Sequence, residues 1–166
     1  WHRAAAILIF KDESLNETLL QKRSKTKEPE PGLLCQQGGH LISGETYLQG
    51  ALRELYEEML VGLSLPNVDI SPLFRLKNTP EAEFQLVYKL VYRGPFNIDK
   101  EEVEEWFWMK VDELLNEIKL YPEKYTQTCK FIFSEYQQRC PKPTPDRERG
   151  KDDDEDEEED EGFEDD

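Results

Sequence analysis

The chain has 166 residues, with 21 Lys and Arg against 37 Asp and Glu, and its formal charge at pH 7 is −16. Thirteen of those acids and only one base lie in residues 151–166, so residues 1–150 carry a formal charge of −4. The length suits one domain and is too short for two of typical size. The sequence contains no apolar run of about 18 residues that could cross a membrane. It also lacks the Lys and Arg surplus of a nucleic-acid platform.

Apolar runs and period-two spacing predict five strands. They cover residues 4–10, 18–23, 68–76, 83–92 and 106–111, and the first two form a hairpin. Helical spacing and capping residues predict helices at 45–61, 112–119 and 123–139. This order predicts a mixed α/β domain over residues 1–140, with a sheet packed between helices. Residues 141–166 contain three prolines and then the acidic run, and we expect them to form a disordered tail.

The predicted helix at 45–61 carries both an apolar stripe and a group of carboxylates. The stripe consists of Leu48, Leu52, Leu55 and Met59. Three carboxylates at i, i+3 and i+4 are expected on the opposite face: Glu54, Glu57 and Glu58. Three like charges this close repel unless a cation lies among them, and carboxylate oxygens suit Mg²⁺ or Mn²⁺. A solvated charged helix face is the alternative interpretation.

The spacing Gly39-x5-Glu45-x7-Arg53-Glu54-Leu55-x-Glu57-Glu58 resembles the Nudix signature. The resemblance implies an α/β/α sandwich with a mixed sheet, in which Glu54, Glu57 and Glu58 bind a divalent metal that a diphosphate substrate bridges. It also implies that the Gly39 carbonyl is a further ligand and that Glu45 and Arg53 form an orienting salt bridge. Leu60 stands where the signature has Gly. Since Gly closes a helix through a left-handed conformation, we expect this helix to continue for another turn.

Several short stretches also resemble isopentenyl-diphosphate isomerase, which is built on the Nudix fold. They are His2-Arg3-Ala4, residues 20–24, Pro31-Gly32, Gly39-His40, Glu81-x-Glu83 and residues 102–108. In that enzyme, histidines and glutamates at such places hold a metal. The resemblance therefore implies a second metal site, whose ligands here would be His2, His40, Glu81 and Glu83.

The same comparison argues against isomerase activity. Isomerisation needs an acid and a base on opposite faces of the alkene, and the isomerases supply a cysteine shortly before the histidine of the Gly-His loop. That position is Gly38 here, and Cys35 lies three residues earlier. The isomerases also keep only the last helix glutamate, whereas this chain has all three. A full carboxylate set favours hydrolysis, in which metal activates a water and a glutamate removes its proton.

One basic stretch, residues 22–27, is a candidate for binding the diphosphate of a substrate through Arg23 and Lys27. A solvated basic loop is the equal alternative. Trp106 and Trp108 share one face of a predicted strand, and we expect them to pack against the sheet.

Three cysteines, Cys35, Cys129 and Cys140, show no zinc or disulfide spacing. We expect them to be reduced thiols in a cytoplasmic or nuclear protein. The chain begins with Trp1 rather than Met, so we expect it to be a fragment or a trimmed chain.

The first hypothesis is therefore a Nudix hydrolase, dependent on Mg²⁺ or Mn²⁺, that cleaves a diphosphate linkage by attack of water on phosphorus. Its substrate would be a small molecule with a nucleoside diphosphate joined to another group, as in ADP-ribose. One alternative is isopentenyl-diphosphate isomerase. Another is a non-catalytic binding module of the same fold, whose acidic tail recruits a basic protein partner.

Overall fold

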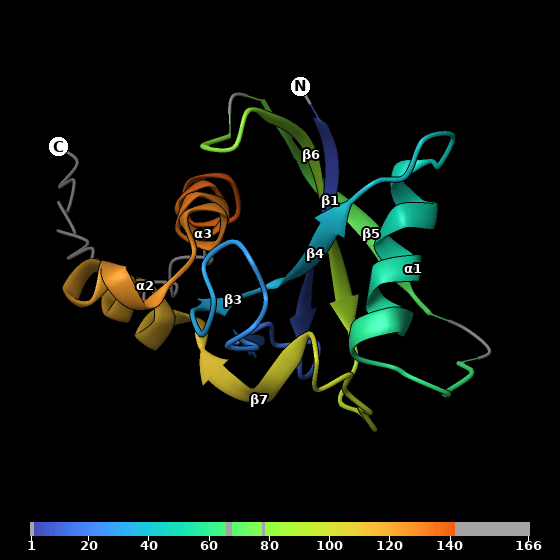
Figure 1. Cartoon of the computed structure of the whole chain (residues 1–166). Helices are drawn as coiled ribbons and strands as arrows, with labels where there is room; N and C mark the ends of the chain where they lie inside the picture. The colour runs from blue at the N-terminus through green and yellow to red at the C-terminus, as the bar shows by residue number, and fades with distance from the viewer. Residues whose placement is uncertain (1, 66–67, 78, 142–166) are drawn as a thin grey trace, which may run out of the picture.

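A computed structural model describes residues 2–65, 68–77 and 79–141 (Figure 1). Within these ranges the strands are β1 (His2–Phe10), β2 (Glu17–Arg23), β3 (Leu34–Cys35), β4 (Gln37–His40), β5 (Ile70–Leu76), β6 (Glu83–Val91) and β7 (Val103–Lys110). The helices are α1 (Tyr47–Glu58), α2 (Val111–Leu120) and α3 (Gln127–Arg139), with a 3-10 turn, η1 (Pro122–Lys124). None of the described helices is long and apolar enough to cross a membrane. Apart from Pro141, the expected disordered tail lies outside the described residues.

On one side of β1, the sheet splits into two branches, which begin with β4 and β2. β6 runs parallel to β1 along its whole length, from His2 opposite Glu83 to Phe10 opposite Val91, and β5 pairs antiparallel with β6. β4 pairs with the first half of β1, whereas β2 meets β1 only where Phe10 lies opposite Thr18 and then pairs with β3 and β7. β4 and β2 therefore diverge along one edge of β1.

Both faces of the sheet are covered by helices, because β1 alternates between two apolar clusters. Ala5, Ile7 and Ile9 pack with Ala51, Leu55 and Met59 of α1 and its C-terminus. Ala6, Leu8 and Phe10 pack with Cys129, Ile132 and Phe133 of α3. The predicted α/β/α sandwich with a mixed sheet is confirmed, with α1 on one face and α2 and α3 on the other (Figure 1).

Helix α1 ends at Glu58, and the expectation that it continues past Leu60 is wrong. The loop before β7 binds the carbonyls at the helix end: the Asn97 amide donates to the Met59 carbonyl at 2.8 Å, and the Asp99 amide donates to the Glu58 carbonyl at 2.9 Å. Because a neighbouring segment satisfies these carbonyls, the chain can leave the helix here without a glycine at position 60. The helix therefore ends with Glu58 beside the loop at 97–102.

The buried face of α1 is rotated from the predicted stripe. Leu55 and Met59 are buried as expected, but Leu48 is 42% exposed, and Ala51 and Glu58 are buried instead. The first turn packs closely on the segment after β4, where a Cβ on Gly50 would lie 2.8 Å from Leu41 Cγ. The helix thus approaches this segment closely at Gly50, and the face at 51, 55 and 58 meets the sheet.

Residues 123–139 form two elements rather than the single predicted helix. Tyr125 and Thr126 are extended between η1 and α3, since Tyr125 is buried and the Thr126 amide donates to the Leu34 carbonyl at 3.0 Å. The Thr126 side chain then caps α3 by accepting from the Cys129 amide at 3.2 Å. The N-terminus of α3 is thereby held beside β3.

Candidate active site

A cavity of about 620 Å³ lies beside β4, between the carboxylates of α1 and the start of α3. Small-molecule sites have volumes of about 300–1,000 Å³, so its size suits one small ligand. Nine of the candidate residues line it: Arg23, Lys27, Gly39, His40, Glu54, Glu57, Glu58, Glu81 and Glu83. The other three candidates, His2, Glu45 and Arg53, are not among the residues that line it.

Arg53 ties the loop before α1 to the carboxylates of the helix. Its Nε lies 2.6 Å from Glu45 Oε1, and its Nη1 lies 2.8 Å from Glu54 Oε1 and 3.2 Å from Glu57 Oε2. Its Nη2 also donates to the His40 carbonyl at 3.0 Å. The expected ion pair with Glu45 is thus present, and the Arg53 hydrogen bond is the main reason that the pKa of Glu45 is lowered. One guanidinium therefore sets the positions of two helix carboxylates and the end of β4.

Gly39 lets β4 pass directly beside Glu54. A Cβ at Gly39 would lie 2.5 Å from the Glu54 carboxyl carbon, so a larger residue would push this carboxylate away. The contact explains physically why a glycine stands here in the motif. It also puts the Gly39 backbone beside the Glu54 carboxylate.

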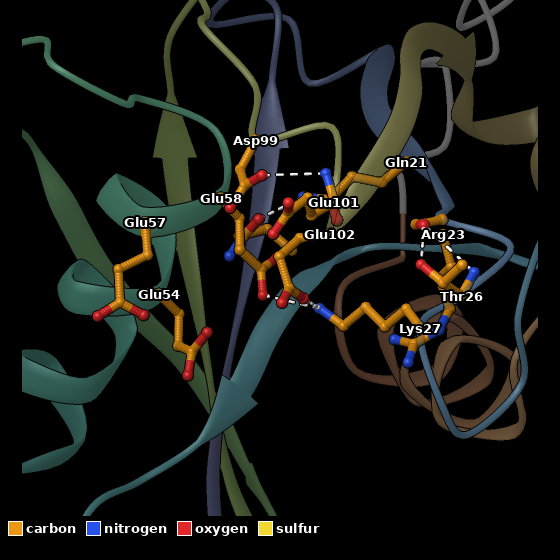
Figure 2. A network of polar contacts seen from close by, with 12 residues as sticks. Gln21, Arg23, Thr26, Lys27, Glu54, Glu57, Glu58, Asp99, Glu101 and Glu102 are labelled. Carbon is orange, nitrogen blue, oxygen red and sulfur yellow. Dashed lines mark hydrogen bonds and ion pairs between the residues drawn. The ribbon is translucent and has the colours of Figure 1, made fainter.

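Glu58 is the buried carboxylate among the three helix glutamates. Its Oε1 accepts from Lys27 Nζ at 3.0 Å, and the same Nζ lies 2.5 Å from Glu102 Oε2. Figure 2 shows Lys27 reaching these two carboxylates from the loop after β2. Burial raises the pKa of Glu58 to about 7, although Lys27 acts in the opposite direction. Glu58 is therefore poised to exchange a proton near neutral pH.

The three helix glutamates do not all lie opposite the buried face of α1, contrary to the expectation from their spacing, because Glu58 is buried. Their side chains are 17% (Glu54), 59% (Glu57) and 6% (Glu58) exposed. The rotation of α1 turns Glu58 toward the sheet edge and leaves Glu57 near solvent (Figure 2). All three still line the same cavity, so they can act on one ligand.

A second group of ligand-type side chains lies at the start of β6. Ligand atoms of His40, Glu81 and Glu83 all lie within 4.8 Å of one another, and His40 Nε2 contacts Glu83 Oε1. The His2 ring lies 5.8 Å from that of His40. Pairing of β1 with both β4 and β6 brings these residues together. The four residues implied by the isomerase resemblance are thus neighbours.

Arg23 reaches the cavity with part of its guanidinium already engaged. Its Nη2 donates to the Pro29 carbonyl at 2.8 Å, whereas its Nε is buried and has no hydrogen-bond partner among the described residues. Lys27 is paired with two carboxylates. Neither side chain of the basic stretch is a freely solvated surface group.

Cys35 lies in the wall of the cavity. Its thiol is buried, and burial raises the pKa of Cys35 to about 11. At position 38, where the isomerases place their cysteine, a Cβ would lie 2.8 Å from the Ala5 carbonyl oxygen. The backbone of β1 therefore leaves no room for a side chain there.

Trp106 and Trp108 pack away from the cavity. Their rings contact that of Phe96, at centroid distances of 4.6 Å for Trp106 and 6.1 Å for Trp108.

Sequence reasoning missed several residues of the cavity. Glu102 completes the pairing of Lys27, and Gln36, Gln85 and Thr128 contribute uncharged polar groups. They lie on four separate segments, and no spacing pattern connects them. The only signal was the position of Glu102 in the stretch that resembles the isomerases.

The family model of the NUDIX domain matches residues 1–131. The chain is 34% identical over 130 residues to an isopentenyl-diphosphate Delta-isomerase of Serratia proteamaculans, covering 75% of this chain and 70% of that protein. It is 30% identical over 114 residues to an uncharacterized Nudix hydrolase of Yersinia pestis, covering 68% of this chain and 60% of that protein.

Two solved structures have the same fold. The DR0079 protein of Deinococcus radiodurans aligns with a TM-score of 0.71 at 22% identity, covering 81% of this chain and 82% of that chain. The NUDIX domain of Shewanella oneidensis NrtR complexed with ADP ribose aligns with a TM-score of 0.60 at 16% identity, covering 83% and 87%. The chain therefore belongs to the Nudix hydrolases, in the branch of that superfamily that resembles isopentenyl-diphosphate isomerase.

Proposed function

We propose that this Nudix hydrolase uses Mg²⁺ or Mn²⁺ to cleave the diphosphate linkage of a nucleoside diphosphate joined to another group, as in ADP-ribose. The observation that carries the proposal is a single cavity lined by Glu54, Glu57 and Glu58 together with the cations Arg23 and Lys27. Carboxylates suit a hard divalent cation, and Arg and Lys suit the phosphate oxygens. The ADP ribose bound by the Shewanella domain makes that compound the first substrate to test.

Glu54, Glu57 and Glu58 would hold the metal, with the Gly39 carbonyl as a further ligand. The fit is supported by the oxygen donors that meet where Gly39 touches Glu54, and by the burial of Glu58, whose negative charge a cation would stabilise. A bound divalent cation would polarise the phosphorus and lower the pKa of a water molecule.

One glutamate of the set takes the proton from the attacking water, and Glu58, the most buried of the three, is the candidate. Arg53 and Glu45 act as positioning residues, because Arg53 holds Glu54 and Glu57 through its Nη1. Arg23 and Lys27 bind the diphosphate.

The proposal is tested by incubating the protein with ADP-ribose, dinucleotides, coenzyme A and nucleoside triphosphates, with and without Mg²⁺ or Mn²⁺. We expect a phosphate-bearing product from at least one compound, and only when metal is present. Cleavage in water enriched in ¹⁸O should place the label on a phosphate, since water attacks phosphorus. A panel without any product would contradict the proposal.

The second candidate is isopentenyl-diphosphate isomerase, which the Serratia relative favours. In that case His2, His40, Glu81 and Glu83 would bind the metal, and Cys35 would act on the alkene. The high pKa of Cys35 and the lack of room at Gly38 count against it. Conversion of isopentenyl diphosphate to its isomer, abolished by Cys35→Ser, would establish it.

A metal at His2, His40, Glu81 and Glu83 is also compatible with a hydrolase. His40→Ala should then remove one bound Mn²⁺ per chain, counted by atomic absorption after dialysis. An unchanged metal content would exclude this second site.

Binding of a basic protein partner by the acidic residues 151–166 remains a prediction. Deleting that segment should leave the turnover number of the hydrolase within about twofold.

A further inference from the structure

Cationic and aromatic side chains gather on the α1 side of the sheet, near the start of that helix. Arg3 lies on β1, Phe84 on β6 and Arg75 on β5, and Lys77 follows β5 directly. Arg75 lies opposite Leu86, a residue of the apolar cluster on the α1 side, and Arg3 lies opposite Phe84. Because side chains alternate along a strand, these residues share one face of the sheet.

Tyr47, the first residue of α1, lies at the centre of this group. The guanidinium carbon of Arg3 is 5.7 Å from the centroid of the Tyr47 ring, and that of Arg75 is 5.9 Å from it. Both distances are within the range of a cation–π contact. Arg3 Nη1 also donates to the Glu45 carbonyl at 3.0 Å. We call the group the cationic aromatic patch, and its residues are Arg3, Tyr47, Arg75, Lys77 and Phe84.

The cations of the patch have no carboxylate partner within the described ranges. None of the ion pairs between described residues involves Arg3, Arg75 or Lys77, and all three side chains are exposed. The carboxylate of Glu45, just before the helix, is held by Arg53 at 2.6 Å. The patch therefore presents three positive charges to an anionic partner.

A hollow of about 80 Å³ lies within the patch, lined by Tyr47, Arg75, Lys77 and Phe84 together with part of β6. Small-molecule sites have volumes of about 300–1,000 Å³, so the hollow is too small for a whole substrate or cofactor. A single side chain is a better match in size. Since aromatic rings and cations surround the hollow, it suits an aromatic side chain that is flanked by carboxylates.

This chain contains such a segment. Residues 151–166 include thirteen acids and one base, and Phe163 is the only aromatic residue within 142–166. Glu161 and Glu164 lie on either side of it. The segment thus combines a single ring with an excess of negative charge, which complements the patch in both respects.

Helix α3 ends beside the strand that carries Arg75. The guanidinium carbon of Arg139, the last residue of α3, is 5.5 Å from the centroid of the Phe74 ring. Phe74 packs on the α3 side of β5, and the next residue, Arg75, is on the other side. Among the described strands β5 is at the edge of the sheet. Residues 142–150 can span up to about 30 Å when extended, so the acidic segment can reach round this edge.

We propose that residues 151–166 dock on the cationic aromatic patch of the same chain. Phe163 occupies the hollow, and neighbouring carboxylates bind Arg3, Arg75 and Lys77. A short tether gives the segment an effective concentration in the millimolar range, so it binds in preference to a separate acidic protein or nucleic acid. No residue of the patch lines the active-site cavity. The docking is therefore independent of the proposed hydrolysis.

Cross-linking of the full chain with a carbodiimide tests the docking, because this reagent joins a carboxylate to an amine without a spacer. In the monomeric product, mass spectrometry should find Lys77 joined to carboxylates of residues 152–166. The yield should be about fivefold or more above that at Lys119, an exposed lysine of α2 that serves as the reference. In ~1 M NaCl, where the screening length falls to about 3 Å, the difference should disappear.

Two substitutions test the contact from its two sides. Arg75→Glu turns an attraction into a repulsion and should lower the yield at Lys77 about fivefold or more. Phe163→Ala removes the ring and should lower it in the same way, which keeps the test decisive should Arg75→Glu fail to fold. Arg93→Glu is the matched control, since Arg93 is a 70% exposed arginine just after β6 and the change in net charge is the same. It should leave the yield unchanged.

The docking makes three claims that these yields can contradict. Equal yields at Lys77 and Lys119 in the parent, or equal losses in Arg75→Glu and Arg93→Glu, would overturn a specific contact with the patch. Cross-links found only between two chains would mean that a second copy supplies the segment, and would overturn docking within one chain. An unchanged yield in Phe163→Ala would exclude Phe163 from the hollow.

Discussion

The two ends of the cavity differ in how their polar groups are paired. At the end formed by α1, Arg53 binds Glu45, Glu54 and Glu57, and Lys27 binds Glu58 and Glu102. Next to α3, the buried amide oxygens of Gln36 and Gln85 have no hydrogen-bond partner among the described residues. The charged groups of the α1 end therefore hold one another in place, whereas these two amide oxygens are not held by any side chain there. Changes at the α1 end should affect cleavage of every substrate.

The largest effect should come from Glu58→Gln. The variant keeps the shape of the side chain but removes the charge and the proton acceptor, so turnover of ADP-ribose and of ATP should both fall about 10²-fold or more. The rise in melting temperature on adding Mn²⁺ should also shrink. Exposed Glu113→Gln on α2 is the control and should change neither quantity. Loss of only the ADP-ribose activity would contradict a role of Glu58 in the reaction itself.

Alanine substitutions at the neighbouring glycines Gly38 and Gly39 should separate an effect on turnover from an effect on the free energy of unfolding. Gly39→Ala places a methyl group against the Glu54 carboxylate, whose side chain must move, so turnover should fall about tenfold to 10²-fold with little loss of stability. Gly38→Ala instead places the methyl group 2.8 Å from the Ala5 carbonyl oxygen. The backbone of β1 cannot move aside as easily as the Glu54 side chain can. We expect a loss of about 1–3 kcal/mol in unfolding free energy. Urea unfolding and turnover of both variants check this; similar losses of stability would contradict it.

Arg53→Lys should lower turnover about tenfold while keeping the positive charge. A lysine has a single ammonium group, which cannot reproduce the planar fork that reaches Glu45, Glu54 and Glu57 together. Because Arg53 acts through those carboxylates, the loss should appear in kcat for ADP-ribose and ATP alike, and added Mn²⁺ should restore part of it. A change in KM for one substrate only would assign Arg53 a different role.

The α1 end was predictable because its residues are close in the sequence. Glu54, Glu57 and Glu58 lie on one helix, whose periodicity sets their relative positions. Their orientation toward the sheet was not predictable, since it depends on how the helix packs against segments outside it, such as the segment at Leu41 that Gly50 approaches closely. Periodicity alone therefore predicted that Glu58 lies on the face opposite the apolar stripe, whereas Glu58 is buried.

The α3 end could not be predicted by the same means. Gln36, Gln85 and Thr128 line one cavity because β1 pairs with both β4 and β6, and because the Thr126 amide binds the Leu34 carbonyl. These are contacts between distant segments, for which a single sequence has no signal. The neighbours His40, Glu81 and Glu83 are equally distant in the chain, and only the resemblance to a known family pointed to them.

The smallest expected effect concerns the pH dependence of stability without metal. Burial raises the pKa of Glu58 to about 7, whereas an unfolded glutamate has a pKa of about 4.3. Between these values the folded protein holds a proton that the unfolded chain has lost, so the contribution of Glu58 to stability falls as the pH rises from about 4.3 to 7. In EDTA, the melting temperature of the parent minus that of Glu58→Gln should therefore decrease by roughly 10 °C between pH 5 and pH 8, since about two pH units at ~1.4 kcal/mol each lie below the folded pKa and ~1 kcal/mol shifts the melting temperature by about 4 °C. Mn²⁺ favours the charged carboxylate and should abolish or reverse this trend. A difference that is constant with pH in EDTA would mean that Glu58 is already ionised at pH 5, and Lys27 would then outweigh burial in setting its charge.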